Sequence, residues 1–447
     1  MNFQYFFANY KNIHFIGVGG VSMSGLAAFC LTKGFNVSGS DKVFSVGVKR
    51  LRALGATISV GHRAENAKGA ELIVYSSAVS DKNPELKYAV KHGIPVLRRS
   101  ELLGQILSLY PRSVCVSGSH GKTTATAMLA EVFIAAGLNP TVFLGGDRKT
   151  FGNFRSGGDI AIAEACEYRR NFLDVSPRVA VVLNIDNDHV DTFADMDDET
   201  AAFKEFVKDG LAVVNADDYY ARKVFNSTTI TFGIKNLAVY SAKYLTKSGC
   251  RAFTAYAYGK KLGRIRLKIA GEHNVYNALA VIAVSNEFKV PFAVIKRAIE
   301  NFDGVKRRNE FIGEYRGVPC YADYAHHPTE IAALLKDKSE KTLAVFQPHT
   351  YSRTAKLLGD FVSSLNGADG LIVYKTYPAR EKFSADGDAK RLYIETGKIF
   401  KGYSAYAGGY AALAKELKTH AEKFRKIVFI GAGDIYETAK KFISENG

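Results

Sequence analysis

One stretch of the chain, residues 113–126, combines a short apolar strand, a glycine turn and the start of a helix. It reads Ser-Val-Cys-Val-Ser-Gly-Ser-His-Gly-Lys-Thr-Thr-Ala-Thr, and we predict that the helix begins at Lys122. Gly118 and Gly121 let the backbone come close to an anion, and the free N–H groups of the turn and the helix start then point at it. The stretch therefore predicts an α/β fold with a phosphate-binding turn.

This turn matches only part of the P-loop pattern G-x-x-x-x-G-K-[ST], because Val116 stands in the place of the first glycine. The remaining G-x-x-G-K-T-T is a weak signal alone, but a strand before it and a helix after it are the context that a P-loop requires. Lys122 is then expected to reach the outer phosphates of a nucleotide, and Thr123 to bind magnesium. The alternative is an ordinary glycine-rich turn that caps a helix.

Length and charge limit the classes of protein. The chain has 447 residues, 47% of them hydrophobic and 23% charged, with a formal net charge of +16. This length exceeds one ordinary hydrophobic core, so two to four domains are expected. The basic residues suit anionic partners such as nucleotides, but they are scattered, which favours a solvated basic surface over a nucleic-acid groove. We expect no nucleic acid among the partners.

Cysteine usage and apolar segments indicate the compartment. The cysteines, at positions 30, 115, 166, 250 and 320, include no C-x-x-C pair, which favours reduced thiols in a cytosol over a disulfide framework or a structural zinc site. The N-terminus has no cleavage signature, and no run of about 18 apolar residues occurs. We expect a cytoplasmic protein without a membrane span.

The start of the chain predicts a βαβ unit, with strand 12–17, a glycine turn, an apolar helix and strand 36–41. The turn departs from the dinucleotide-binding pattern G-x-G-x-x-G, because Ser22 occupies the third glycine position. Asp41 lies about where an acid would bind a ribose. The unit therefore suits NAD or another nucleotide diphosphate. Further strands of this first domain are predicted at 72–75 and 95–97.

Two strands after the P-loop run into acidic or His-containing segments. Strand 159–163 leads to Glu164, and strand 179–185 leads to a segment that contains His189. Because ligands bind at the carboxyl ends of strands in open α/β sheets, Glu164 and His189 are candidate magnesium ligands. Magnesium prefers oxygen, so His189 is the less expected of the two. The alternatives are a solvated carboxylate and a loop cap.

A strongly apolar helix is predicted to begin within residues 271–277, Gly-Glu-His-Asn-Val-Tyr-Asn. Asn274 and Asn277 stand three apart and face the same way, so their amides can contact an adenine edge. Asn near a helix start is also a routine cap, and the residues by themselves favour capping.

The last third of the chain again alternates between strands and helices. Polar clusters at residues 323–330 and 347–354 follow two of its strands. In the first cluster, His326 and His327 suit orientation or proton transfer better than a metal site, because a Pro follows and no third ligand is evident. The alternative is a turn with a buried His. The strands are predicted near 319–323, 342–346, 370–374 and 426–430.

Eight motifs, taken together, resemble those of the Mur ligase family, in the family's order and over nearly the whole chain. Within that family they are similar to the branch that joins L-alanine to UDP-N-acetylmuramate. Single motifs are weak, but eight in order are highly specific. They are His14–Gly25, Gly118–Thr124, Glu164–Glu167, Asn184–His189, Gly271–Asn277, Phe302–Arg308, Asp323–Pro328 and Gln347–Arg353.

The resemblance implies a three-domain α/β enzyme. Residues 1–109 would form a Rossmann-like domain for the UDP-sugar, 110–304 a P-loop ATPase-type parallel sheet for ATP, and 305–447 a Rossmann-like domain that closes and helps to bind the amino acid. The implied reaction is ATP- and Mg2+-dependent ligation of L-alanine to the lactyl carboxylate of UDP-N-acetylmuramate through an acyl-phosphate. This is the first peptide step of peptidoglycan precursor synthesis in the bacterial cytoplasm. The protein could be a monomer or a dimer.

Three other interpretations remain. The runner-up is a ligase that attaches a preformed peptide to UDP-N-acetylmuramate. An NAD-dependent oxidoreductase is disfavoured by Ser22 and by the central P-loop. A nucleotide-gated binding protein would leave Glu164 and His189 without a role.

The resemblance also implies roles for individual residues. The catalytic candidates are Lys122, His120, His189, Arg353 and His326. The nucleotide-binding candidates are Gly118, Ser119, His120, Gly121, Lys122, Thr123, Thr124, His273, Asn274, Asn277, Arg308 and Asp323. The substrate-binding candidates are Gly17, Gly19, Gly20, Ser22, Asp41, Ser76, Ser77, Tyr324, His326 and Arg353. The magnesium candidates are Thr123, Glu164 and His189.

Overall fold

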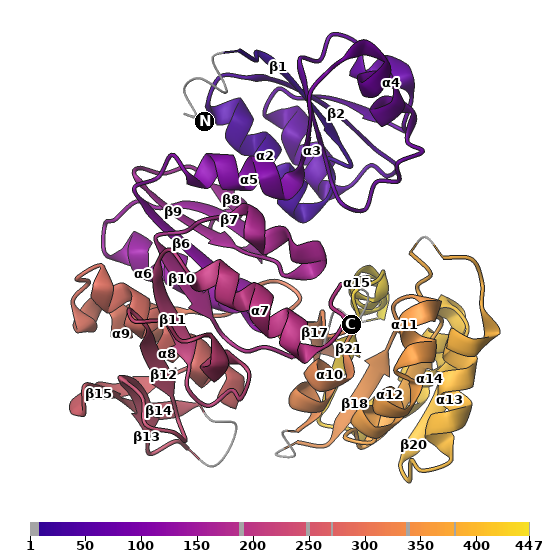
Figure 1. The fold of residues 1–447 in the computed structure, drawn as a ribbon. Helices are drawn as coiled ribbons and strands as arrows, with labels where there is room; N and C mark the ends of the chain where they lie inside the picture. Colours follow the sequence, from indigo (N-terminus) through magenta and orange to yellow (C-terminus); the bar gives the residue numbers. More distant parts are fainter. Residues whose placement is uncertain are drawn as a thin grey trace. The chain divides into compact units, whose positions relative to one another are not determined.

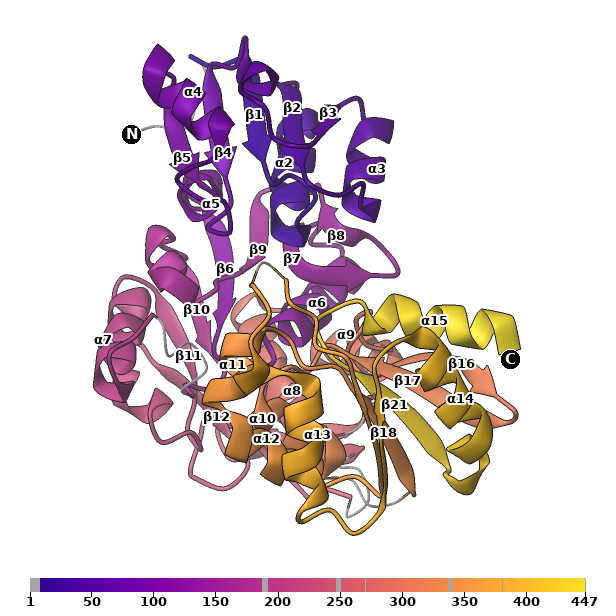
Figure 2. The same cartoon turned by 90° about the vertical axis from the view of Figure 1, so that its right-hand side faces the viewer.

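The computed structural model describes residues 9–186, 192–246, 251–269, 271–336, 340–379 and 381–446. Strands and helices alternate along the chain and build three sheets (Figures 1 and 2). The sheets belong to two compact units, one that contains most of the described residues up to Phe302 and one that contains those from Asp303 onward with a few residues before it. The predicted three-domain α/β class is confirmed, whereas the boundaries near residues 109 and 304 stay predictions.

The first sheet is entirely parallel and has the strand order β3-β2-β1-β4-β5. The chain starts at the centre, winds to one edge and then crosses to the other, so the carboxyl ends of β1 and β4 form a switch point where open sheets bind ligands. This is the Rossmann-like domain that the βαβ pattern predicts. Its elements are β1 (Asn12–Ile16), α2 (Val21–Thr32), β2 (Asn36–Asp41), α3 (Val46–Ala53), β3 (Thr57–Val60), η1 (Ala64–Ala67), β4 (Leu72–Tyr75), α4 (Pro84–His92), β5 (Val96–Arg98) and α5 (Arg99–Leu107).

The central sheet has the strand order β15-β14-β13-β12-β11-β10-β6-β9-β7-β8. Its core from β13 to β7 is parallel, as predicted, but antiparallel pairs form both edges. Strand β6, which carries the P-loop, lies between β9 and β10. The elements are β6 (Arg112–Ser117), α6 (Lys122–Ala135), β7 (Thr141–Arg148), β8 (Gly152–Arg155), β9 (Ile160–Glu164), η2 (Tyr168–Asp174), β10 (Val179–Val182), α7 (Met196–Val207), β11 (Leu211–Asn215), η3 (Ala221–Val224), β12 (Ile230–Gly233), β13 (Tyr240–Lys243), β14 (Ala252–Ala257), β15 (Lys260–Arg266), α8 (Glu272–Glu287) and α9 (Phe292–Asn301).

The last sheet has the strand order β16-β17-β21-β18-β19-β20 and is parallel apart from the hairpin of β16 and β17. Helices connect successive parallel strands, as in a Rossmann-like domain. The elements are β16 (Glu310–Tyr315), β17 (Val318–Asp323), α10 (Pro328–Leu335), β18 (Thr342–Phe346), α11 (Tyr351–Lys356), α12 (Leu358–Leu365), β19 (Gly370–Tyr374), η4 (Ala385–Gly387), α13 (Ala389–Gly397), β20 (Tyr403–Ala407), α14 (Tyr410–His420), η5 (Ala421–Lys423), β21 (Lys426–Ile430) and α15 (Ile435–Asn446).

Three of the strands that sequence reasoning missed lie at sheet edges. Strands β3, β16 and β20 each close one edge of a sheet. Most of their side chains are exposed or only partly buried. A half-exposed edge strand lacks the continuous apolar run that marks a buried parallel strand.

The first and central sheets share one continuous hydrophobic core. Phe29 of α2 packs against Phe143 of β7 and Phe154 of β8, with ring centroids 5.6 and 6.2 Å away. The Arg98 guanidinium also lies 3.1 Å from the Asp174 carboxylate across the same junction. Buried aromatic pairs of this kind stabilise an interface beyond the area that they bury. These two domains therefore pack as one compact unit.

Two expectations, the lack of a membrane span and the presence of reduced thiols, can be compared with the described residues. No helix among them is long and apolar enough to cross a membrane. Cys30, Cys115, Cys166 and Cys320 carry free thiols, and Cys250 lies outside the described residues.

A buried carboxylate stabilises the first domain from inside. Glu85, in the first turn of α4, is fully buried. The Ser40 hydroxyl donates to it at 2.6 Å, the Asn66 amide donates at 2.7 Å, and His14 Nε2 lies 3.7 Å away. Burial alone would raise the pKa of Glu85, but the nearby His14 and the hydrogen bonds from Ser40 and Asn66 outweigh it and hold this pKa at about 2. The ionised form is therefore part of the folded structure.

Replacing Glu85 by Gln should lower the free energy of unfolding by about 3 kcal/mol at pH 7. The folded state holds the pKa at about 2 against an ordinary value of 4.5, so this stabilisation is present above pH 4.5 and is lost as the pH falls toward 2. The difference between the wild type and the variant should shrink over that window. Urea unfolding followed by circular dichroism at several pH values measures it.

The matched control is Glu65→Gln, which removes an exposed carboxylate from the neighbouring turn η1. This control should leave the unfolding free energy within about 0.5 kcal/mol of the wild type. A difference for Glu85→Gln that does not change with pH would contradict the assigned ionisation.

Candidate active site

The glycine turn of the first domain is held by the acid that ends β2. Asp41 Oδ2 accepts a hydrogen bond from the Gly19 N–H at 2.8 Å. A Cβ at Gly19 would lie 2.9 Å from the same oxygen, so a larger residue there would displace the Asp41 carboxylate. Gly17 adopts a φ of +77°, Gly20 is the N-cap of α2, and Ser22 lies in its first turn. Asp41 thus positions the turn, and its contact with a ribose stays a prediction.

Ser76 and Ser77 follow β4, the strand beside β1, and therefore lie next to this turn. A Cβ at Gly17 would come 3.6 Å from Ser76 Oγ. The Ser77 carbonyl accepts a hydrogen bond from the Arg169 guanidinium at 2.8 Å. The structure thus brings the substrate candidates of the first domain together at one edge of the sheet.

The P-loop has the backbone that its glycines predict. Helix α6 begins at Lys122, as expected. Gly118 has a φ of +129°, and a Cβ there would lie 2.9 Å from the Asn184 carbonyl oxygen. Gly121 has a φ of +88°, and a Cβ there would lie 2.7 Å from Asn277 Oδ1. Both glycines are therefore required by close neighbours as well as by backbone conformation.

Lys122 is held inside the loop by a carboxylate that sequence reasoning did not assign. Its ammonium donates to the carbonyl oxygens of Gly118 and Ser119 at 2.5 and 3.1 Å. It also donates to Glu167 Oε1 at 2.9 Å, and Glu167 is fully buried. The ion pair compensates two charges that would each be costly to bury alone. The sequence signals for Glu167 are its place just after a strand that ends in an acid and its membership of the motif Glu164–Glu167.

The loop after β10 binds the P-loop from one side. The Asn184 amide accepts from the His120 N–H at 2.8 Å and donates to the His120 carbonyl at 3.0 Å. The Ser119 hydroxyl accepts from the Asp186 N–H at 2.8 Å, and the Asp186 carboxylate lies 3.3 Å from His120 Nε2. Asn184 and Asp186 thereby orient His120. Sequence reasoning placed Asn184 in a motif but gave it no role.

Oxygen ligands that suit magnesium meet beside the P-loop. The Thr123 hydroxyl donates to Glu164 Oε2 at 2.9 Å, and the Gly145 N–H donates to the other oxygen of Glu164. A hydroxyl and a carboxylate at the end of a P-loop are the donor types that Mg2+ prefers. His189 lies outside the described residues. Among the described residues, no group of three His, Cys, Asp or Glu side chains forms a metal cluster.

The two candidate adenine contacts lie inside α8 and not at its cap. The helix begins at Glu272, so Asn274 and Asn277 belong to its first turns, together with His273. Both Asn side chains are buried, and the Asn277 amide donates to Asn274 Oδ1 at 3.2 Å. The interpretation as helix caps is therefore wrong. Burial against Gly121 places Asn277 beside the phosphate-binding turn.

The second compact unit gathers another polar cluster after β17. Asp323 accepts from the N–H groups of Asn309 and Ala325, both at 2.7 Å. Burial raises the pKa of Asp323 to about 6, although the Arg308 charge acts in the opposite direction. Arg308 Nη1 lies 3.4 Å from the Glu330 carboxylate. Both predicted nucleotide contacts of this unit are thus engaged within the cluster.

His326 and Arg353 both lie near His349, a residue that sequence reasoning did not single out. The His326 and His349 rings are 6.0 Å apart, and His326 Nδ1 lies 3.0 Å from the Tyr324 carbonyl oxygen. Burial, followed by the charges of His326 and Arg353, lowers the pKa of His349 to about 4. His349 is therefore neutral at pH 7. His327 instead caps α10 and is buried. This matches the alternative interpretation of His326 and His327, a turn with a buried His.

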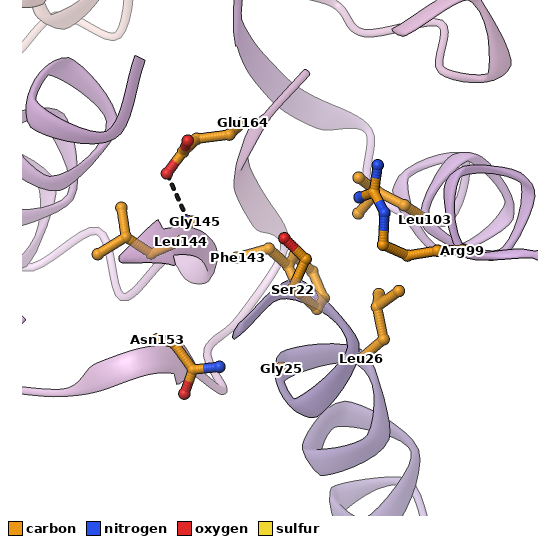
Figure 3. Close-up of a pocket in the computed structure, with 10 residues that line it drawn as sticks. All are labelled: Ser22, Gly25, Leu26, Arg99, Leu103, Phe143, Leu144, Gly145, Asn153 and Glu164. Atoms are coloured by element: carbon orange, nitrogen blue, oxygen red, sulfur yellow. Dashed lines mark hydrogen bonds between the residues drawn. The ribbon is translucent and has the colours of Figure 1, made fainter. Parts of the chain in front are cut away.

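A pocket with about 300 Å³ of space open to solvent lies beside Glu164. Helices α2 and α5 contribute one side, and strands β7, β8 and β9 contribute the other. Figure 3 shows Ser22 between Glu164 and Arg99. The pocket thus joins the glycine turn of the first domain to the candidate magnesium ligand of the central domain.

Three family models match the chain in the same order as its three sheets. The Mur ligase family catalytic domain matches residues 12–111, and the Mur ligase middle domain matches residues 116–285. The domain described as Mur ligase, glutamate ligase domain matches residues 307–433.

Named relatives match over nearly the full length. The UDP-N-acetylmuramate–L-alanine ligase of Aquifex aeolicus is 42% identical over 97% of this chain and 98% of its own. That of Caldanaerobacter subterraneus subsp. tengcongensis is 40% identical over 98% of both chains. The solved UDP-N-acetylmuramate-alanine ligase of Thermotoga maritima is similar with a TM-score of 0.85, at 29% identity over 97% of this chain and 98% of that one. The chain belongs to the Mur ligase family.

Proposed function

We propose that this protein joins L-alanine to the lactyl carboxylate of UDP-N-acetylmuramate at the expense of ATP. This reaction is the first peptide step of peptidoglycan precursor synthesis. The observation that carries the proposal is similarity at about 40% identity, over nearly the whole chain, to enzymes with that name. A P-loop with an adjacent carboxylate, Glu164, supports the use of ATP. Two of the three substrates, ATP and UDP-N-acetylmuramate, are nucleotides of the cell interior, so the reaction belongs in the bacterial cytoplasm.

ATP binds to the central domain in this proposal. Its phosphates lie in the turn from Gly118 to Thr124, where backbone N–H groups and a helix start favour anions. Asn274 and Asn277, with His273, contact the adenine, because both amides are buried and that of Asn277 lies against that turn. Arg308 and Asp323 complete the nucleotide contacts.

Magnesium binds to Thr123 and Glu164, with His189 as a further ligand inferred from the family resemblance. When bound, it supplies positive charge that offsets the charge on the phosphates. Lys122 has the same electrostatic role from the protein side, once its ammonium turns from Glu167 toward the outer phosphates.

The chemistry proceeds through an acyl-phosphate. The lactyl carboxylate attacks the γ-phosphorus of ATP, ADP leaves, and the amine of L-alanine then attacks the acyl carbon and expels phosphate. His120, held by Asn184 and Asp186, orients the acyl group. Because both first reactants are anions, their approach requires the positive charge that Lys122 supplies.

L-Alanine binds to the second compact unit. The Arg353 guanidinium, on α11, matches a carboxylate bidentately, and its side chain makes no hydrogen bond or ion pair with other described residues. His326 and Tyr324 border the same region. A site on a separate unit makes domain closure a condition of catalysis.

UDP-N-acetylmuramate binds to the first domain, at residues Gly17, Gly19, Gly20, Ser22, Asp41, Ser76 and Ser77. Ser22 in the place of a third glycine favours UDP over NAD. We also propose that the domains divide near residues 109 and 304, between the sheets. Monomer and dimer both remain compatible with the proposal.

The alternative function is attachment of a preformed peptide to the same sugar nucleotide. It would use the same P-loop and the same first domain, and only the acceptor would differ. The measurement that separates the two is phosphate release from ATP by purified protein with magnesium and UDP-N-acetylmuramate, with one acceptor added at a time. We expect release only when L-alanine is present. Release with a peptide but not with alanine would support the alternative, and no release would favour a binding protein.

Replacing Lys122 by Ala should abolish amide formation, because the charge that brings the anions together is lost. Affinity for UDP-N-acetylmuramate should change less than about threefold, since its site is on another domain. Calorimetric titration with the sugar nucleotide, beside the phosphate assay, measures both. Lys260→Ala on the exposed edge strand β15 is the control and should change neither. Equal loss of binding and turnover in the Lys122 variant would contradict separate sites.

Replacing Arg353 by Ala should raise the KM for alanine by about tenfold or more, while the KM for ATP stays within about twofold. The reason is loss of a bidentate contact with the alanine carboxylate. Initial rates at varied alanine and ATP concentrations measure the two constants. The control, Lys401→Ala, removes an exposed charge before β20. An unchanged KM for alanine would remove Arg353 from the acceptor site.

A further inference from the structure

Arg99 lies at the wall of the pocket beside Glu164. It is partly buried and is the first residue of α5. It makes no hydrogen bond or ion pair with any residue that the structure describes. Its neighbour in the chain differs sharply: the Arg98 guanidinium lies 2.9 Å from Glu101 and 3.1 Å from Asp174. Arg98 therefore has a structural role that Arg99 lacks.

The position of Arg99 at the start of a helix is unfavourable for a positive charge, so this charge does not stabilise the fold. A helix N-terminus carries a partial positive charge and destabilises a nearby cation. The only acidic residue in the first turn of α5 is Glu101, which is already paired with Arg98. A partly desolvated guanidinium without an anion adds a further cost. Both costs are offset if an anionic ligand binds in the pocket.

The pocket lies between two groups that the proposed reaction uses. Ser22 belongs to the first turn of α2, just after the glycine turn, and Glu164 is the carboxylate beside the P-loop. Figure 3 shows Arg99 facing this space from α5, on the side away from Glu164. Arg99 therefore lines the same pocket as Ser22 and Glu164, within reach of a ligand bound there.

We propose that Arg99 binds an anionic oxygen of the sugar nucleotide and thereby positions its carboxylate for reaction. The inference rests on the proposed function, because it takes UDP-N-acetylmuramate as the occupant of the pocket. A guanidinium binds carboxylate and phosphate oxygens with the same fork geometry. Two groups of the ligand have this chemistry: the diphosphate and the lactyl carboxylate.

The test compares three ligands by calorimetric titration of the full-length protein. UDP-N-acetylmuramate has both the diphosphate and the carboxylate, UDP-N-acetylglucosamine lacks the carboxylate, and UDP lacks the sugar as well. The variants are Arg99→Gln, Arg99→Lys and the control Arg178→Gln. Arg178 is exposed and precedes β10, at the opposite end of the strand from the P-loop side.

We expect Arg99→Gln to weaken binding of UDP-N-acetylmuramate by about tenfold or more, and Arg99→Lys to weaken it less, because the charge remains while the fork is lost. The control should bind like the wild type. If Arg99 contacts the diphosphate, all three ligands lose affinity by the same factor. If it contacts the carboxylate, only UDP-N-acetylmuramate loses affinity.

Thermal unfolding separates binding from folding. Without ligand, Arg99→Gln should unfold at the same temperature as the wild type or slightly higher, since a cation leaves a helix N-terminus. Unchanged affinity of Arg99→Gln for all three ligands would overturn the inference and leave the proposed function intact. Failure of the wild type to bind UDP-N-acetylmuramate would overturn both.

Discussion

The close contact between the P-loop and its neighbours is the constraint on which the central domain depends. Gly118 lies against the Asn184 backbone and Gly121 against the Asn277 amide, at distances that leave no room for a Cβ. These neighbours follow β10 and begin α8, so the loop is held between two elements that are distant in sequence. Any widening would separate His120 from Asn184, which binds both backbone groups of that residue. Close packing thus preorganises the loop for an anion.

The hydrophobic core that the first two domains share also holds the walls of the pocket in place. Phe29 and Phe143 pack across the junction, so the glycine turn and the P-loop belong to one compact unit. A reaction that joins groups bound to both domains needs reacting atoms held about 3–3.5 Å apart. A hydrophobic junction serves this purpose better than a polar one, because relative motion would expose apolar surface to water. The second unit, which carries Arg353, is compact by itself.

The positive charges of the proposed site fall into two classes. Lys122 is paired with the buried Glu167, so ligand binding has to exchange one anionic partner for another. Arg99 and Arg353 have no such internal partner among the described residues, and both suit recognition of a ligand oxygen. The difference has a physical basis: the fully buried Glu167 carboxylate needs a counter-charge in the fold, whereas a partly buried guanidinium keeps some solvation until a ligand arrives.

The sequence by itself determined many of the strands and helices of this protein. Apolar runs marked many of the buried parallel strands, Gly118 and Gly121 marked the phosphate-binding turn, and the order of the motifs indicated the family. Only the tertiary structure decided which side chains meet: Glu167 with Lys122, Asn184 with His120, and Asp41 with the Gly19 N–H. Backbone conformation follows from local sterics and periodicity, which a single chain segment contains. Partners of charged and polar groups depend on strand order and on packing between segments far apart in the chain, which no local pattern contains.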